Sequence, residues 1–151
     1  LGTCESDACC AHSIDICTIS SLTLRAIRFD PGTGGHYLKA RAAQVTIENN
    51  SFDDAGGTGT NYMIDLPAGS IGRIADNWFV QGSDKDNFSA FIALGAEDLL
   101  HDSNGLRVEN NEARFVPGLT RSSAFLADWT ASRVVMQGNR IADGIRQYEQ
   151  R

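Results

Sequence analysis

Short runs of alternating apolar and polar residues recur along the chain, and four of them contain an asparagine at the same place. They are VTIENNSF (45–52), RIADNWF (73–79), RVENNEARF (107–115) and VVMQGNRI (134–141). The aligned asparagines are Asn50, Asn77, Asn111 and Asn139, at intervals of 27, 34 and 28 residues. Alternation over so few residues predicts β-strands. A repeat of about 20–50 residues indicates stacked structural units.

Apolar residues flank each asparagine at fixed positions, three before it and two after it. The first set is Ile47, Ile74, Val108 and Met136, and the second is Phe52, Phe79, Ala113 and Ile141. LTLRAIRF (22–29) is a fifth, imperfect copy in which Ile27 replaces the asparagine. A second apolar run precedes each copy, at HSIDICTI (12–19), HYLKARA (36–42), NYMIDLP (61–67), FSAFIALG (88–95) and SAFLADWT (123–130). Each turn of chain is therefore expected to hold at least two strands.

This pattern predicts an all-β protein, a parallel β-solenoid of about five coils, over residues 12–144. Stacked coils lie roughly 4.8 Å apart. An inward asparagine at each tight bend can donate to and accept from the bends above and below, which predicts an internal asparagine ladder. Residues 1–17 are predicted to form a cysteine-rich cap or assembly segment leading into the first coil, and 145–151 a tail or cap.

All four cysteines, Cys4, Cys9, Cys10 and Cys17, fall in the first seventeen residues. They allow three pairings, among which the sequence does not choose. Disulfides within the chain, disulfides to a neighbouring chain, free thiols and a metal site with His12 all stay open, although the spacing lacks a zinc knuckle. Disulfides would indicate an oxidising compartment. We therefore expect a secreted or cell-surface protein, with no signal peptide in this sequence.

The composition argues against two kinds of partner. A net charge of −6 and a pI near 4.9 are the reverse of the clustered basic surface that nucleic acids require. No apolar run approaches the roughly 18 residues of a membrane helix. With 42% hydrophobic residues, the 151-residue chain is long enough for one domain with a continuous core.

The candidate catalytic residues lie on the outward side of the second apolar runs. They are His36, Lys39 and Arg41 in HYLKARA, and Asp65 in NYMIDLP. Because the two runs align with an offset of 26 residues, Lys39 is expected directly beneath Asp65. One reading is a cross-coil ion pair, worth roughly 0–1 kcal/mol if exposed. The other is a sugar-acid site, where Lys39 or Arg41 holds or deprotonates a substrate and Asp65 tunes it.

Further binding candidates are His12, Tyr37, Tyr62, Glu97 and His101, the last two in the long excursion GAEDLLHDSNG (95–105). No metal site and no cofactor are predicted. The acidic stretch GSDKDN (82–87) leaves Ca²⁺ open as an alternative, but it lacks the EF-hand spacing and its closing Glu. Motifs of common hydrolases and nucleotide-binding proteins are absent from the sequence.

Several of these stretches resemble a known group of proteins. AHSIDI (11–16), GHYLKARA (35–42), YMIDLPAG (62–69) and NFSAFIALGAEDLLH (87–101) look like the pectate-lyase-like superfamily, in particular bacterial secreted members of unassigned activity. The resemblance covers about residues 11–143 and implies a right-handed parallel β-helix. It also implies that His12, His36, Lys39, Arg41, Asp65, Glu97 and His101 occupy a shared candidate surface. The cysteine cluster is not part of that pattern.

Three functions are compatible with these observations. The first is an extracellular β-helix that is structural or binds polysaccharide, with self-assembly through its coil ends. The second is a polysaccharide lyase or epimerase acting on acidic sugars, although the sequence offers few basic groups and leans against an enzyme. The third is a virion fibre or tailspike-like component. The expected partners are accordingly polysaccharide or further copies of the chain, as a homo-oligomer or a disulfide-linked assembly.

Overall fold

The computed structural model describes residues 12–151, in which every regular element is a β-strand. The largest sheet contains nine strands: β1 (Ile14–Arg25), β4 (Leu38–Glu48), β7 (Ile64–Leu66), β8 (Ile71–Ala75), β10 (Ala90–Leu94), β11 (Arg107–Glu109), β13 (Ser123–Asp128), β14 (Val135–Gln137) and β16 (Ile145–Gln150). A second sheet contains β2 (Arg28–Phe29), β5 (Ser51–Asp53), β9 (Trp78–Gln81), β12 (Glu112–Phe115) and β15 (Arg140–Ile141). A third pairs β3 (Thr33–Gly35) with β6 (Thr58–Thr60).

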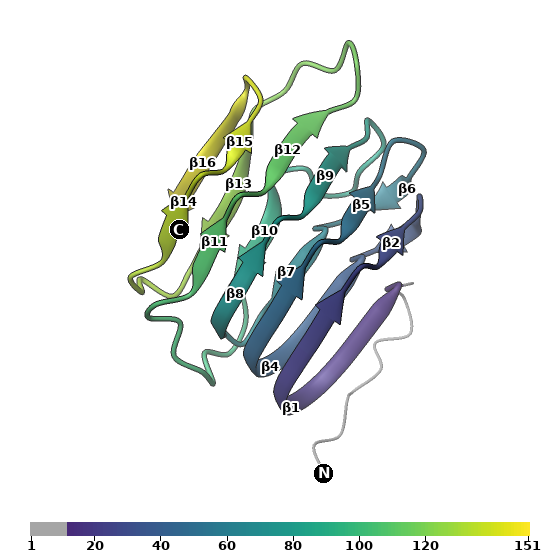
Figure 1. Cartoon of the computed structure of the whole chain (residues 1–151). Helices are drawn as coiled ribbons and strands as arrows, with labels where there is room; N and C mark the ends of the chain where they lie inside the picture. The colour runs from purple at the N-terminus through teal and green to yellow at the C-terminus, as the bar shows by residue number, and fades with distance from the viewer. Residues whose placement is uncertain (1–11) are drawn as a thin grey trace.

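The strands wind around one axis, and each pairs in parallel with the equivalent strand one coil away. Strand β4 spans a corner, because its first part pairs with β7 and its second part with β8. The colours of Figure 1 run in order along the stack, from β1 at one end to β16 at the other. The predicted parallel β-solenoid is confirmed. Strand β16 extends the stack by pairing with β13, so residues 145–150 form an ordered strand and not a frayed tail.

The predicted asparagine ladder is present at the corner between the first and second sheets. Nδ2 of Asn50 donates to the carbonyl of Leu24 (3.1 Å) and to Oδ1 of Asn77 (2.9 Å). The same side-chain bond joins Asn77 to Asn111 and Asn111 to Asn139, each at 3.0 Å. These amides satisfy backbone groups that would otherwise be buried without partners.

The residue before each ladder position adopts a left-handed backbone conformation that turns the chain by a corner. These residues are Ala26, Asn49, Asp76, Asn110 and Gly138, with φ between 54° and 67°. Asparagine, aspartate and glycine tolerate this conformation best. Ala26 is the exception, and it lies in the copy in which Ile27 replaces asparagine. There the backbone N–H of Ile27 still donates to Oδ1 of Asn50 (3.0 Å).

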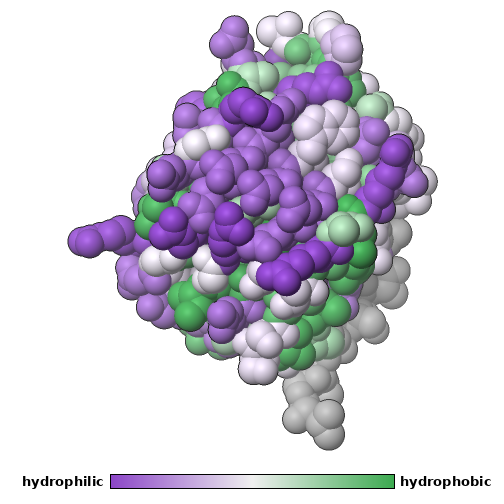
Figure 2. All heavy atoms as spheres, viewed as in Figure 1, coloured by the Kyte–Doolittle hydropathy of each residue, from purple (hydrophilic) through white to green (hydrophobic). Residues whose placement is uncertain are grey.

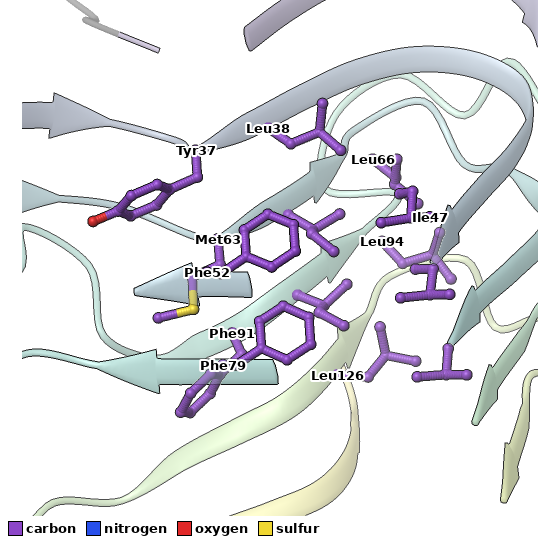
Figure 3. Packing of buried hydrophobic residues seen from close by; sticks show 14 of the residues in the cluster. Tyr37, Leu38, Ile47, Phe52, Met63, Leu66, Phe79, Phe91, Leu94 and Leu126 are labelled. Atoms are coloured by element: carbon purple, nitrogen blue, oxygen red, sulfur yellow. The ribbon is translucent and has the colours of Figure 1, made fainter. Parts of the chain in front are cut away.

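Stacked side chains fill the interior. Phe29, Phe52 and Phe79 lie in register on successive coils, with ring centroids 4.7 and 4.9 Å apart. Figure 3 shows the rings of Phe52 and Phe79 one above the other. The Phe column ends where Ala113 follows Phe79 in the register, and Phe125 meets the edge of the Phe79 ring there. The face seen in Figure 2 is mostly hydrophilic, with smaller hydrophobic areas toward its rim.

A buried polar cluster around Asp54 ties the loops of the second and third coils together. Its carboxylate accepts hydrogen bonds from Tyr37 Oη (2.6 Å), Thr60 Oγ1 (2.6 Å), the Gly82 N–H (3.0 Å) and Lys85 Nζ (3.1 Å). The side chains of Asp54 and Lys85 are both fully buried. Burial and the bond to Asp54 raise the pKa of Tyr37. Every oxygen of this carboxylate therefore has a partner.

The predictions of disulfides and of an N-terminal cap concern residues that lie mostly outside the described range. Cys4, Cys9 and Cys10 lie outside the described residues, so the disulfides and most of the N-terminal cap stay predictions. Cys17 lies in β1, where the register against β4 shifts between Ile16 and Ile19. None of residues 12–151 forms a helix long and apolar enough to cross a bilayer.

Candidate functional site

Most of the predicted site residues meet on the outer face of the first halves of β1, β4 and β7. The strand register places Asp15, Lys39 and Asp65 in one row across three coils. A parallel row of rings runs beside it, because His36 stacks between His12 (4.9 Å) and Tyr62 (5.5 Å). The backbone N–H of His36 also donates to Nδ1 of His12 (2.9 Å). The predicted position of Lys39 beneath Asp65 is confirmed.

Glu97 reaches this face from the loop after β10. Its carboxylate contacts Lys39 Nζ at 2.6 Å and also pairs with the Arg41 guanidinium. The loop is fixed by backbone bonds from Gly95 to the Leu66 carbonyl (2.9 Å) and from Glu97 to the Pro67 carbonyl (3.0 Å). One carboxylate from the fourth coil therefore neutralises two basic side chains of the second coil. We call Lys39, Arg41 and Glu97 the ion-pair cap.

A nearly buried His–Asp pair lies beside and beneath the cap. The side chain of Asp65 is 5% exposed and that of His36 is 10% exposed, with 3.4 Å between Oδ2 and Nε2. Lys39 Nζ lies 3.7 Å from the same Asp65 oxygen. The Oδ1 atom of Asp65 and the Nδ1 atom of His36 have no hydrogen-bond partner. Buried polar atoms without partners are uncommon and indicate a place for water or ligand. The ion pair between Lys39 and Asp65 is therefore largely buried, unlike the exposed pair considered in the sequence analysis.

Burial favours the neutral form of both members of this pair. It raises the pKa of Asp65 to about 7, against the opposing effect of Lys39. It also lowers the pKa of His36 to about 3, with further lowering by His12 and Lys39. Between these values the pair carries one proton, on the carboxyl group. Asp65 can then donate or accept a proton near neutral pH, which is the requirement for a general acid or base.

Two predicted binding residues lie elsewhere. The prediction that Tyr37 offers a binding surface is wrong, because its side chain is buried and its hydroxyl donates to Asp54 in the interior. It follows the apolar pattern of the strand start, since the equivalent residue of the next coil is the buried Met63. His101 packs with its backbone against Ala68 and Gly69, at the bend after β7.

The face continues into the fourth and fifth coils as an apolar floor that the sequence reading missed. Ala93 and Ala127 follow Asp65 in the same register row, and Ala90 and Ala124 lie beside them. Trp129 packs on this group, with the Arg151 guanidinium 5.0 Å from its ring. Alanines at outward strand positions were the signal that could have revealed it, since a solvated face would carry polar residues there.

No group of three or more His, Cys, Asp or Glu side chains within residues 12–151 is arranged to hold a metal ion. In the acidic stretch considered for Ca²⁺, Asp84 accepts the Gly59 N–H (3.2 Å) and Asn87 accepts the Ser89 N–H (3.0 Å). Asn87 thus forms a local turn, whereas Asp84 joins its loop to the loop of the preceding coil.

No protein family, no curated protein and no solved structure matches this chain. The fold and site define its class as a parallel β-solenoid with an ionisable cluster on the outer face of its first coils.

Proposed function

We propose that this chain is an extracellular β-solenoid that binds acidic polysaccharide on the outer face of β1, β4 and β7. The observation that carries the proposal is the convergence of Lys39, Arg41 and the incompletely bonded Asp65 on one strip. Cationic side chains bind sugar carboxylates, and a carboxyl oxygen without a partner binds a hydroxyl. The flanking ring of His12 is partly exposed and adds an apolar surface for a sugar ring.

The resemblance to the pectate-lyase-like superfamily supports the same strip. Its more specific stretches, GHYLKARA and YMIDLPAG, contain the starts of the adjacent strands β4 and β7, next to residues 14–16 of β1. The stretch 87–101 supplies β10 and the loop that carries Glu97. The stretches that carry the resemblance, although far apart in the sequence, therefore lie side by side on the outer face of β4 and β7.

Binding is tested by calorimetric titration with oligomers of galacturonate and of mannuronate. Arg41→Ala is expected to weaken binding at least about five-fold, because one charge-assisted hydrogen bond is worth about 1–3 kcal/mol. Arg25→Ala is the matched control, since Arg25 lies at the far end of β1 and pairs with Glu48. Absence of binding to every acidic oligomer, or equal weakening by both variants, contradicts the proposal.

A second candidate function, elimination or epimerisation at a uronate, is favoured by the near-neutral pKa of Asp65. Asp65 or Lys39 would remove the C5 proton next to the sugar carboxylate, and Arg41 would stabilise the resulting enolate. In elimination the C4–C5 double bond then forms as the C4–O4 bond breaks, and the leaving oxygen takes a proton from water. In epimerisation C5 takes a proton from water on its opposite face. A lyase forms an unsaturated product, which absorbs ultraviolet light. Asp65→Asn is expected to lower that rate at least about 100-fold. If the wild-type protein forms no such product and leaves the C5 configuration unchanged with pectate, alginate and glycosaminoglycans, the enzymatic function is excluded and binding remains.

A further inference from the structure

The buried pair of His36 and Asp65 is closed off by an ion pair that comes from a different part of the chain. Lys39 is 15% exposed and contacts both Asp65 and Glu97, whereas the side chain of Glu97 is 43% exposed. The order from inside to outside is therefore Asp65, Lys39, Glu97. A ligand that approaches from solvent meets Glu97 first.

Glu97 presents to Lys39 and Arg41 the same chemical group that an acidic ligand would present. One carboxylate oxygen contacts each basic side chain. Burial raises the pKa of Glu97, but the hydrogen bonds from Lys39 and Arg41 outweigh burial and leave it below its ordinary value. The carboxylate is thus ionised at neutral pH and satisfies both cations.

The attachment of Glu97 allows it to leave without unfolding a coil. It lies on a loop whose next residues, Asp98, Leu99 and Leu100, are all exposed. The strands β10 and β11 on either side of the loop are held by their own sheet partners. Displacing the side chain breaks only two ion pairs, and ion pairs whose members are partly exposed to solvent are weak.

We propose that Glu97 is an intramolecular competitor that occupies the anion-binding position of Lys39 and Arg41, and that a ligand carboxylate takes its place. Exchange of one carboxylate for another keeps both cations neutralised. The identity of the natural ligand rests on the proposed function. The existence of an anion-binding position at Lys39 and Arg41 does not depend on that function.

The first test uses acetate as a probe, because it carries the carboxylate without the sugar. In Glu97→Gln, acetate is expected to produce saturable shifts in the NMR signals of the Lys39 and Arg41 side chains. The wild-type protein is expected to bind acetate at least about three-fold more weakly, given the energy of the ion pairs that acetate must replace. Asp98→Asn removes the same charge from the neighbouring residue and is expected to behave like the wild type. Equal acetate binding by Glu97→Gln and the wild type overturns the proposal.

The second test uses galacturonate oligomers and their methyl esters. Glu97→Gln is expected to bind the acids about three- to ten-fold more tightly than the wild type, with no gain for the esters. A gain for acetate without any binding of oligomers would sustain the competitor role of Glu97 and refute the polysaccharide proposal. If the protein binds the oligomers and Glu97→Gln leaves that binding unchanged or weakens it, the polysaccharide proposal stands and the competitor role of Glu97 is refuted.

Discussion

Asp54→Ala is expected to lower the free energy of unfolding by about 3–5 kcal/mol, the cost of leaving one member of a buried ion pair without its partner. The variant would leave the Lys85 ammonium in a fully buried position, 3.1 Å from a carboxylate that is no longer there. Tyr37, Thr60 and Gly82 would each lose an acceptor as well. Urea unfolding followed by circular dichroism measures the loss.

Two further variants separate the buried charge from other effects. Asp30→Ala removes a carboxylate from an exposed ion pair with Arg28 and is expected to change stability by less than about 0.5 kcal/mol. Asp54→Ala combined with Lys85→Met is expected to recover part of the loss, because no unpaired charge remains in the interior. A loss below about 1 kcal/mol for Asp54→Ala, or no recovery in the double variant, would show that the cluster is not a buried ion pair of this kind.

The Asp54 cluster, unlike the asparagine ladder, has no repeating pattern in the sequence that would predict it. The period of the asparagines was enough to predict the ladder, because each bend repeats the same local pattern. Asp54 lies instead in DDAGG, a stretch whose composition is typical of an exposed turn. Its burial follows from the loops of the second and third coils meeting around it, and no local pattern encodes that contact.

The candidate site divides in the same way. Lys39 and Asp65 are brought together by strand register, which a fixed offset between repeats predicts. Glu97 reaches Lys39 across 58 residues from an irregular loop, and loop paths carry no period. The row of residues on the sheet is therefore predictable from the repeat. The contact of Glu97 with Lys39 and Arg41 is not, although the family resemblance implies that Glu97 shares their surface. Burial is the largest cause of the raised pKa of Asp65, and strand register alone does not predict how deeply an outward side chain is buried.

The two members of the His–Asp pair are expected to affect the pH dependence of stability in opposite directions. In the unfolded chain, with ordinary pKa values of 3.8 for Asp65 and 6.5 for His36, the single proton at intermediate pH resides on the histidine. In the folded protein, with values of about 7 and about 3, it resides on the carboxyl group. Both states bind one proton between about pH 4 and 6.5, so the pair contributes almost no slope there.

Removing either member exposes the dependence of the other. In Asp65→Asn, His36 binds a proton below about pH 6.5 in the unfolded chain but not in the folded one, so stability falls as the pH decreases. In His36→Gln, Asp65 keeps its proton up to about pH 7 in the folded protein and loses it above about pH 4 in the unfolded chain, so stability falls as the pH rises. Each change approaches about 4–5 kcal/mol across its full range, since one pKa unit is about 1.4 kcal/mol.

Urea unfolding at several values between about pH 4 and pH 7 measures these slopes relative to the wild type. The variant that carries both substitutions is the control, because it contains neither titrating group and is expected to lack both slopes. Slopes of the same sign in the two single variants would mean that burial does not move the proton from His36 to Asp65 on folding. That result would also remove the near-neutral acid from the proposed chemistry, since the pKa that qualifies Asp65 for proton transfer arises from the same burial.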